Sequence, residues 1–177
     1  MISGETAAYA EIGADVLRRV MGCFPTGVTV VTASHRGERH GMTLNSLTSV
    51  SLDPPLVLVC LHNDSRTLWA VEGSRSFAIS FLAQGQEKVS NSFARRGEDH
   101  FGGAAALEDH TDPPLIRGRI GHLICAAEAI YPGGDHQIAL GRVIEAATFD
   151  ISPLVFYRGG YHKVEGLASD DTPLWYW

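Results

Sequence analysis

The chain has 177 residues, a formal net charge of −6 and a sequence pI of about 5.7. Its length suits one domain with a sizeable core, while 19 glycines and only 19% charged residues argue against a coiled coil or a disordered chain. No basic stripe of the kind that nucleic-acid-binding domains carry is visible. We therefore expect a single domain over residues 1–177 that binds no nucleic acid.

The cysteines and the hydropathy pattern indicate where the protein works. The three cysteines are Cys23, Cys60 and Cys125, which stand far apart without a CxxC spacing, as is typical of free thiols in a reducing compartment. No apolar run approaches the roughly 18 residues of a membrane span, and no secretory leader is apparent. We expect a cytoplasmic protein that does not enter a membrane.

The N-terminal part of the chain begins with a helix and continues in short strands. Apolar residues recur at helical spacing over 12–21, and a glycine and a proline then end the helix. The β-branched run at 27–33 predicts a strand. A turn at 36–38 and a further strand near 41–46 follow.

The middle of the chain changes from polar to strongly apolar. A hydroxyl-rich segment at 45–52 ends in a pair of prolines, which cannot donate to a strand ladder. The continuous apolar run at 56–61 is typical of a strand buried on both faces. A short helix over 65–73 is predicted next, with Asp64 or Ser65 as its cap.

The remaining elements are mostly strands. In order, we expect a strand at 77–82, a helix at 86–95, a loop over 97–118, strands at 120–131 and 137–149, a hairpin from 154 that turns at 158–160, and an acidic, then aromatic tail at 168–177. Many short strands that do not alternate regularly with helices favour a small antiparallel barrel over a doubly wound parallel sheet.

Three polar clusters are candidates for chemistry. Side chains at 45–51 that form hydrogen bonds suit the carbonyls and ring nitrogens of a heterocycle, or equally a solvent-facing sheet surface. Residues 65–67 place two hydroxyls and a guanidinium at a helix N-terminus, which suits a phosphate, although simple N-capping explains them equally well. The glycine-rich turn at 133–136 holds a histidine that a ligand at a barrel mouth would meet, or is an ordinary turn.

Several common site motifs are absent. The chain has no GxGxxG, GxxxxGK[ST], HExxH or GxSxG sequence. The eight histidines are scattered, with none paired at i, i+4, so we predict no metal site. A nucleotide-binding Rossmann unit and a metalloenzyme are therefore not supported.

Seven segments carry a family resemblance when they are taken together. They are Phe24-Pro-Thr-Gly-Val-Thr-Val-Val-Thr, Gly41-Met-Thr-Leu-Asn-Ser-Leu-Thr-Ser-Val-Ser-Leu-Asp-Pro-Pro-Leu, Cys60-Leu-His-Asn-Asp-Ser-Arg-Thr, Phe77-Ala-Ile-Ser-Phe-Leu, Asn91-Ser-Phe-Ala, Pro132-Gly-Gly-Asp-His and Pro153-Leu-Val-Phe-Tyr-Arg-Gly-Gly-Tyr. Their order and spacing over residues 16–161 resemble the short-chain flavin reductase family. These proteins are the reductase components of two-component flavin-dependent monooxygenases.

The resemblance implies a fold and an activity. The fold is mainly β, a split β-barrel of the FMN-binding, Greek-key type with a few short α-helices, usually as a homodimer with the flavin near the subunit interface. The activity is hydride transfer from NADH or NADPH to FAD or FMN, and the absence of an arginine cluster for a 2′-phosphate favours NADH. Reduced flavin then diffuses to a separate monooxygenase or halogenase.

The resemblance also implies roles for residues at matching positions. The residues implied to line the isoalloxazine are Asn45, Ser46, Leu47 and Thr48, with Thr26 and Ser51 contributing from neighbouring strands and Phe93 lying near the cofactor. The residues implied to hold the flavin phosphate are Ser65, Arg66 and Thr67. His136 is implied to place the nicotinamide as the catalytic positioning residue, and Tyr157 to border the same cavity.

Other functions stay open. A flavin-binding electron-transfer module without pyridine-nucleotide activity is the main alternative, and His136 in its Gly-Asp-His turn favours the reductase over it. An oxidase of the pyridoxamine-phosphate oxidase type is a second alternative, against which the motif at 45–55 argues. A purely structural barrel is the third.

Overall fold

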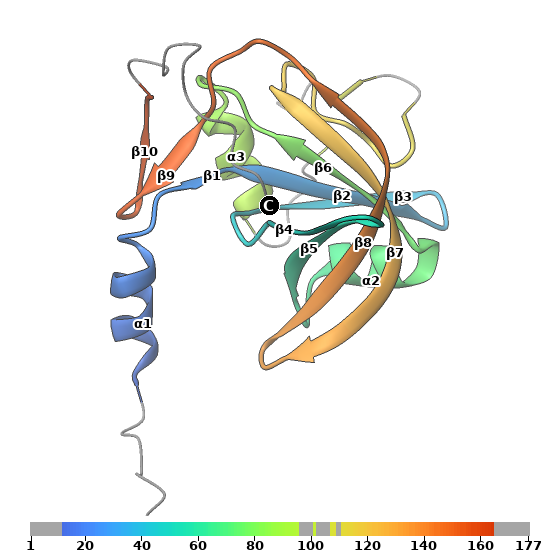
Figure 1. Cartoon of the computed structure of the whole chain (residues 1–177), viewed down its shortest axis with the longest axis horizontal. Coiled ribbons are helices and arrows are strands. Elements are labelled where there is room, and N and C mark those ends of the chain that lie inside the picture. The colour runs from blue at the N-terminus through green and yellow to red at the C-terminus, as the bar shows by residue number, and fades with distance from the viewer. Residues whose placement is uncertain (1–11, 96–100, 102–106, 109–110, 165–177) are drawn as a thin grey trace, which may run out of the picture.

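The computed structural model describes residues 12–95, 101, 107–108 and 111–164 (Figure 1). Part of the predicted loop at 97–118 and the whole tail at 168–177 lie outside the described residues. The helices among the described residues are α1 (Ala14–Met21), α2 (Arg66–Ser74) and α3 (Glu87–Ala94). The remaining elements are strands, so the expectation of a mainly β fold with a few short helices is confirmed.

Seven antiparallel strands form the large sheet. In spatial order they are β3 (Glu38–Leu44), β2 (Thr29–His35), β6 (Ser76–Phe81), β7 (Gly121–Gly133), β8 (His136–Thr148), β5 (Pro55–His62) and β4 (Thr48–Leu52). The two edge strands, β3 and β4, do not pair with each other within the described residues, so strand pairing does not close a barrel. Only residues 45–47 join these edges, a span of at most roughly 14 Å, and the sheet therefore curls.

A second, three-stranded sheet stands beside the large one. Its order is β1 (Thr26–Gly27), β9 (Val155–Tyr157) and β10 (Gly160–His162), which matches the predicted hairpin. The β9–β10 turn uses two left-handed residues, Arg158 at φ 48° and Gly159 at φ 79°.

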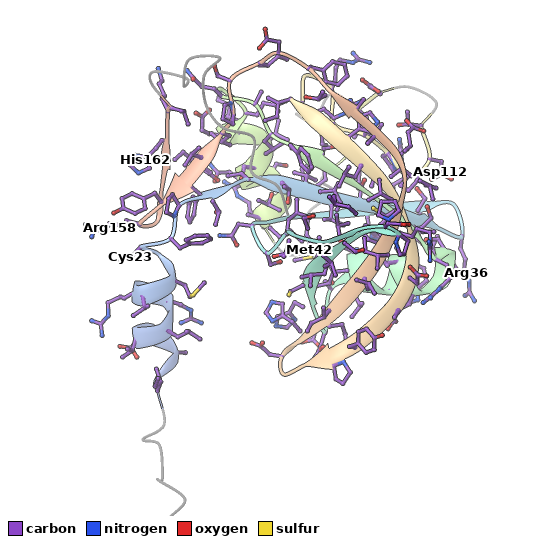
Figure 2. All side chains as sticks on the ribbon, viewed as in Figure 1. Cys23, Arg36, Met42, Asp112, Arg158 and His162 are labelled. Carbon is purple, nitrogen blue, oxygen red and sulfur yellow. The ribbon has the colours of Figure 1, made fainter. Side chains whose placement is uncertain are left out.

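The chain before β1 extends away from both sheets. We call residues 12–24 the N-terminal arm, and Figure 1 shows its helix, α1, pointing away from the body. No residue of α1 is buried. The Arg158 N–H donates to the Gly22 carbonyl at 2.9 Å, and Figure 2 shows Arg158 and Cys23 at this junction. The end of the arm is therefore hydrogen-bonded to the β9–β10 turn.

Two apolar clusters form the core. The larger is enclosed by the curled sheet and α2 and includes Val59, Leu61, Phe77, Ile79 and Val71. The smaller lies under α3 and includes Val30, Leu82, Phe93, Ile116 and Leu154. In the larger cluster, a Cβ at Gly141 would lie 2.5 Å from Phe77 Cζ, so glycine at this position of β8 leaves room for the Phe77 ring.

Strand β5 differs from its prediction. Val57, Val59 and Leu61 are buried, but Leu56 and Leu58 between them are only half-buried. The prediction of burial on both faces is therefore wrong within one chain. The physical reason is that α2 and the curled sheet cover only the inner face of β5.

The helices are short. Among the described residues, none has the length and apolar character that crossing a bilayer requires.

Candidate functional site

The segment predicted to hold a heterocycle is fastened to the end of β5. Ser46 Oγ accepts a hydrogen bond from the Cys60 N–H at 3.1 Å and donates to the Cys60 carbonyl at 3.3 Å. The register of β4 on β5 pairs Thr48 with Leu58, so Ser46 falls opposite Cys60. The Ser46 hydroxyl thus bonds the Cys60 backbone at a position just before β4 begins.

Most of the other residues predicted to contact the ring lie in or beside this segment. Asn45 is exposed, and its Nδ2 donates to Thr26 Oγ1 at 3.2 Å, which links the segment to β1. Leu47 packs against the larger core, while Thr48 is exposed on β4. Ser51 is half-buried and stands opposite Leu56, beyond a bulge in β4.

The predicted phosphate group forms the N-terminus of α2. Ser65 Oγ accepts from the Leu68 N–H at 3.1 Å, so Ser65 is the N-cap, and its hydroxyl hydrogen stays available to donate to a ligand. Thr67 is buried, with 2% of its surface exposed. Arg66 is exposed and has no hydrogen-bond or ion-pair partner among the described residues. The donors open to an anion here are the Arg66 guanidinium, the Ser65 O–H and the backbone N–H groups of Arg66 and Thr67.

The predicted nicotinamide residue lies at the tip of the β7–β8 hairpin. His136 pairs with Gly133 across the hairpin and with His62 on β5. Its Nδ1 lies 2.6 Å from Asp135 Oδ1, and this hydrogen bond lowers the pKa of the exposed Asp135 carboxyl below its ordinary value. The rings of His136 and His62 meet edge to face, with centroids 5.3 Å apart.

The fold brings these three groups together. Ser46 is fixed to Cys60, His136 is opposite His62, and the Ser65 N–H donates to the His62 carbonyl at 2.9 Å. All three contacts fall on the last residues of β5. We call residues 45–48, 62–67 and 134–137 the β5-end site.

Two predicted residues lie elsewhere. Phe93 has 1% of its surface exposed and packs in the smaller core, so contact with a flavin would require its neighbours to move. Tyr157 is on β9, whose hairpin Figure 1 shows far from the β7–β8 tip. Within one chain, Tyr157 therefore does not share a cavity with His136.

Sequence reasoning missed several residues of the site. Asn63, Asp135 and Gln137 received no predicted role, yet Asn63 Nδ2 donates to the Gly134 carbonyl at 3.0 Å and Gln137 Nε2 donates to Asn63 Oδ1 at 3.0 Å. Their common signal is polarity directly beside an apolar strand or a glycine turn. Their pairing follows from the β5–β8 register, which the sequence did not reveal.

The site contains no cluster of metal-ligating side chains. No group of three or more His, Cys, Asp or Glu side chains suited to a metal ion comes together in the described parts of the chain.

Comparison with known proteins identifies the family. The model of the flavin reductase like domain matches residues 21–165. This chain belongs to the flavin reductase-like family. A relative from Streptomyces globisporus, named as an NADH-dependent FAD reductase, is 45% identical to this flavin reductase-like chain over 149 residues, covering 81% of each protein.

Two further comparisons extend this result. The HsaB reductase subunit of a flavin-dependent monooxygenase from Rhodococcus jostii is 37% identical over 166 residues, covering 93% of this chain and 85% of HsaB. The structure of the Streptomyces globisporus C-1027 NADH:FAD oxidoreductase SgcE6 with NAD and FAD fragments superposes with a TM-score of 0.80 at 40% identity. That superposition covers 92% of this flavin reductase-like chain and 100% of SgcE6.

Proposed function

We propose that this chain is an NADH-dependent flavin reductase that passes reduced FAD or FMN to a separate monooxygenase or halogenase. The observation that carries the proposal is the meeting, at the end of β5, of a polar segment, an anion site and a hairpin-tip histidine. The activities named for the related FAD reductase and for the HsaB reductase subunit support it. The working unit we propose is one domain over residues 1–177.

The donor groups of the site fit a flavin. Arg66 offers a guanidinium without a partner among the described residues, beside the N–H groups of α2, for the flavin phosphate. Ser46 is held by Cys60, which fastens the 45–48 segment to β5 as a surface against which a ring can be positioned. Once bound, the flavin supplies the hydride acceptor, and the protein supplies binding and orientation.

His136 positions the nicotinamide in this proposal. Its Nδ1 is engaged by Asp135, which leaves Nε2 to meet a ligand group such as the carboxamide. Hydride transfer needs the two rings stacked with the reacting atoms about 3–3.5 Å apart. Positioning is therefore the main demand on the protein, and no nucleophile or strong base is required.

A direct assay tests the activity. The protein is mixed with NADH and free FAD or FMN, and NADH oxidation is followed at 340 nm. Flavin-dependent loss of absorbance is expected, and the same assay with NADPH ranks the two nucleotides. Flavin binding without NADH oxidation would favour the electron-transfer module instead.

Arg66→Ala tests the phosphate site. Loss of one charge-assisted hydrogen bond is expected to raise the flavin dissociation constant about tenfold, measured by fluorescence titration. Arg36→Ala is the matched control, because Arg36 is an exposed arginine in the β2–β3 turn (Figure 2). An unchanged flavin affinity in Arg66→Ala would mean that the flavin phosphate binds to another part of the molecule.

His136→Ala separates the two ligands. It is expected to slow NADH oxidation at saturating flavin while the flavin dissociation constant stays close to that of the unaltered protein. A variant that lost flavin binding but kept the hydride step would reverse the roles proposed here.

We further propose that the protein works as a homodimer. The outer face of β5 and β8 carries half-buried apolar residues in register, with Leu58 opposite Leu140 and Cys60 opposite Ile138. The N-terminal arm adds apolar side chains that are 41–67% exposed, which are Val16, Leu17, Val20, Met21 and Phe24. A second copy covers both surfaces by symmetry.

The proposed dimer also explains the apolar run at 56–61. A strand with apolar residues on both faces needs cover on both faces, and one chain covers only the inner one. We propose that the curled sheet of each subunit corresponds to the split β-barrel of the family. We place the reaction in the cytoplasm, where free thiols such as Cys23, Cys60 and Cys125 persist.

A further inference from the structure

Asn63 connects the two halves of the β5-end site. Its Nδ2 donates to the Gly134 carbonyl at 3.0 Å, and its Oδ1 accepts from Gln137 Nε2 at 3.0 Å. Its backbone N–H donates to the Asp135 carbonyl at 3.1 Å. Three hydrogen bonds from one residue therefore hold the hairpin tip on both sides of His136.

The hairpin tip has little else to hold it in place. Gly133, Gly134 and Asp135 are exposed, and Gly134 has a left-handed backbone with φ 75°. Both ladders that include β8 end at His136, with partners Gly133 and His62. Beyond that pair and the edge-to-face contact between the His62 and His136 rings, the described contacts that join the tip to the body involve Asn63.

In the direction of the C-terminus, Asn63 is followed closely by the anion site at the start of α2. Asn63 lies between His62 and the N-cap residue Ser65, whose N–H donates to the His62 carbonyl at 2.9 Å. The Asp64 N–H donates to His62 Nδ1 at 3.1 Å, which fixes the ring that meets His136. The loop that carries Asn63 is thus held independently of the hairpin tip.

An asparagine is well suited to this position. The Gly134 carbonyl can only accept a hydrogen bond, so the contacting atom must be a donor, while Gln137 Nε2 needs an acceptor. A carboxamide offers both on one short side chain. Aspartate would place a second acceptor against the Gly134 carbonyl, and alanine would remove both contacts.

We propose that Asn63 is a positioning residue that fixes His136 relative to the anion site at the N-terminus of α2 and so sets the affinity for NADH. The inference rests on the proposed reductase function, since it gives Asn63 a role that acts through His136. Asn63 holds the hairpin tip beside the loop that leads to Arg66, so that the nicotinamide and flavin rings can stack between them. Flavin binding itself does not depend on Asn63.

Steady-state kinetics and flavin titration test this role. Asn63→Ala is expected to raise the KM for NADH about tenfold with kcat changed less and the flavin dissociation constant within about twofold, because two neutral hydrogen bonds are lost. Gln137→Ala, which removes one of them, is expected to give a smaller rise. Gln84→Ala is the control, an exposed amide in the turn before α3, and is expected to change neither constant.

A double-mutant cycle distinguishes positioning from general weakening of the fold. If Asn63 acts through His136, Asn63→Ala has no further effect on kcat/KM for NADH once His136→Ala is present. An equal loss in both backgrounds, or a flavin affinity that falls as much as the NADH affinity, would overturn the proposal.

Hydrogen–deuterium exchange of the ligand-free protein separates this inference from the proposed function. The amides of 135–137 are expected to exchange faster in Asn63→Ala than in Gln84→Ala. Equal exchange in the two variants would contradict the proposal that Asn63 holds the hairpin tip. If the unaltered protein fails to oxidise NADH with any flavin, the proposed function fails. If it does oxidise NADH and the cycle is additive, only the role of Asn63 fails.

Discussion

The β5-end site and the N-terminal arm are opposite kinds of surface. The site gathers polar groups from three parts of the chain and joins them by hydrogen bonds within that chain, such as Ser46 to Cys60 and Asn63 to Gly134. The arm carries apolar side chains that stay 41–67% exposed, and one backbone hydrogen bond links its end, at Gly22, to the β9–β10 turn.

The difference lies in what each surface needs. Polar groups need a few partners at defined geometry, and one curled sheet can supply them. Apolar side chains need a large contact area, which a single projecting helix cannot provide for itself. Hydrogen bonds within one chain thus join the polar groups of the site, whereas the apolar side chains of the arm stay exposed in one chain, and we propose a second copy to cover them.

The largest effect is expected when the apolar face of the N-terminal arm is disrupted. Replacing Leu17 and Val20 together by aspartate removes two apolar contacts of about 1.5–3 kcal/mol each. The dimer dissociation constant is then expected to rise more than about 100-fold, measured by sedimentation velocity.

Arg18→Ala is the control for the arm, because this exposed side chain lies between the apolar positions of α1. Both outcomes depend on the unaltered protein being a dimer, so a monomer at all concentrations would remove the role assigned to the arm.

An intermediate effect is expected at the site. Ser46→Ala removes both hydrogen bonds to Cys60, a loss of about 1–3 kcal/mol. The unfolding midpoint is expected to fall by roughly 2–10 °C in a thermal scan at fixed protein concentration. Ser49→Ala, on the exposed part of β4, is expected to leave the midpoint nearly unchanged. Equal midpoints for the two variants would show that Ser46 does not anchor the segment.

The smallest effect is expected at the exposed Asp135–His136 pair. The hydrogen bond from His136 lowers the pKa of the Asp135 carboxyl. The carboxylate therefore stabilises the folded state at pH values above 3.8, the ordinary pKa of an aspartate. This contribution is lost as the pH falls through the lowered value. The difference in unfolding free energy between the unaltered protein and Asp135→Asn is therefore expected to be present at pH 6 and to shrink below pH 3.8.

Urea titrations at several pH values measure this difference. A difference that grew on acidification would mean that the pair is not favourable in the folded state.

Local pattern was enough for most of the elements. The helical spacing at 12–21, the Ser65 cap and the glycine turn before β10 each depend on residues close in sequence, and each has its counterpart in the structure. The apolar run at 56–61 was correctly predicted as a strand, but its burial was not. Burial depends on what packs against a strand, and the chain by itself covers one side.

The strands, the short helices and the three polar groups could be predicted from local sequence, and these polar groups lie within the seven segments that resemble flavin reductases. Tertiary structure decided which of these groups meet. The register of β5 against β8 sets His62 beside His136 and brings Asn63 to the hairpin tip, whereas Tyr157 and Phe93 are left elsewhere. The reason is that side chains distant in sequence become neighbours only through strand pairing, and a shift of one residue would turn His136 to the other face.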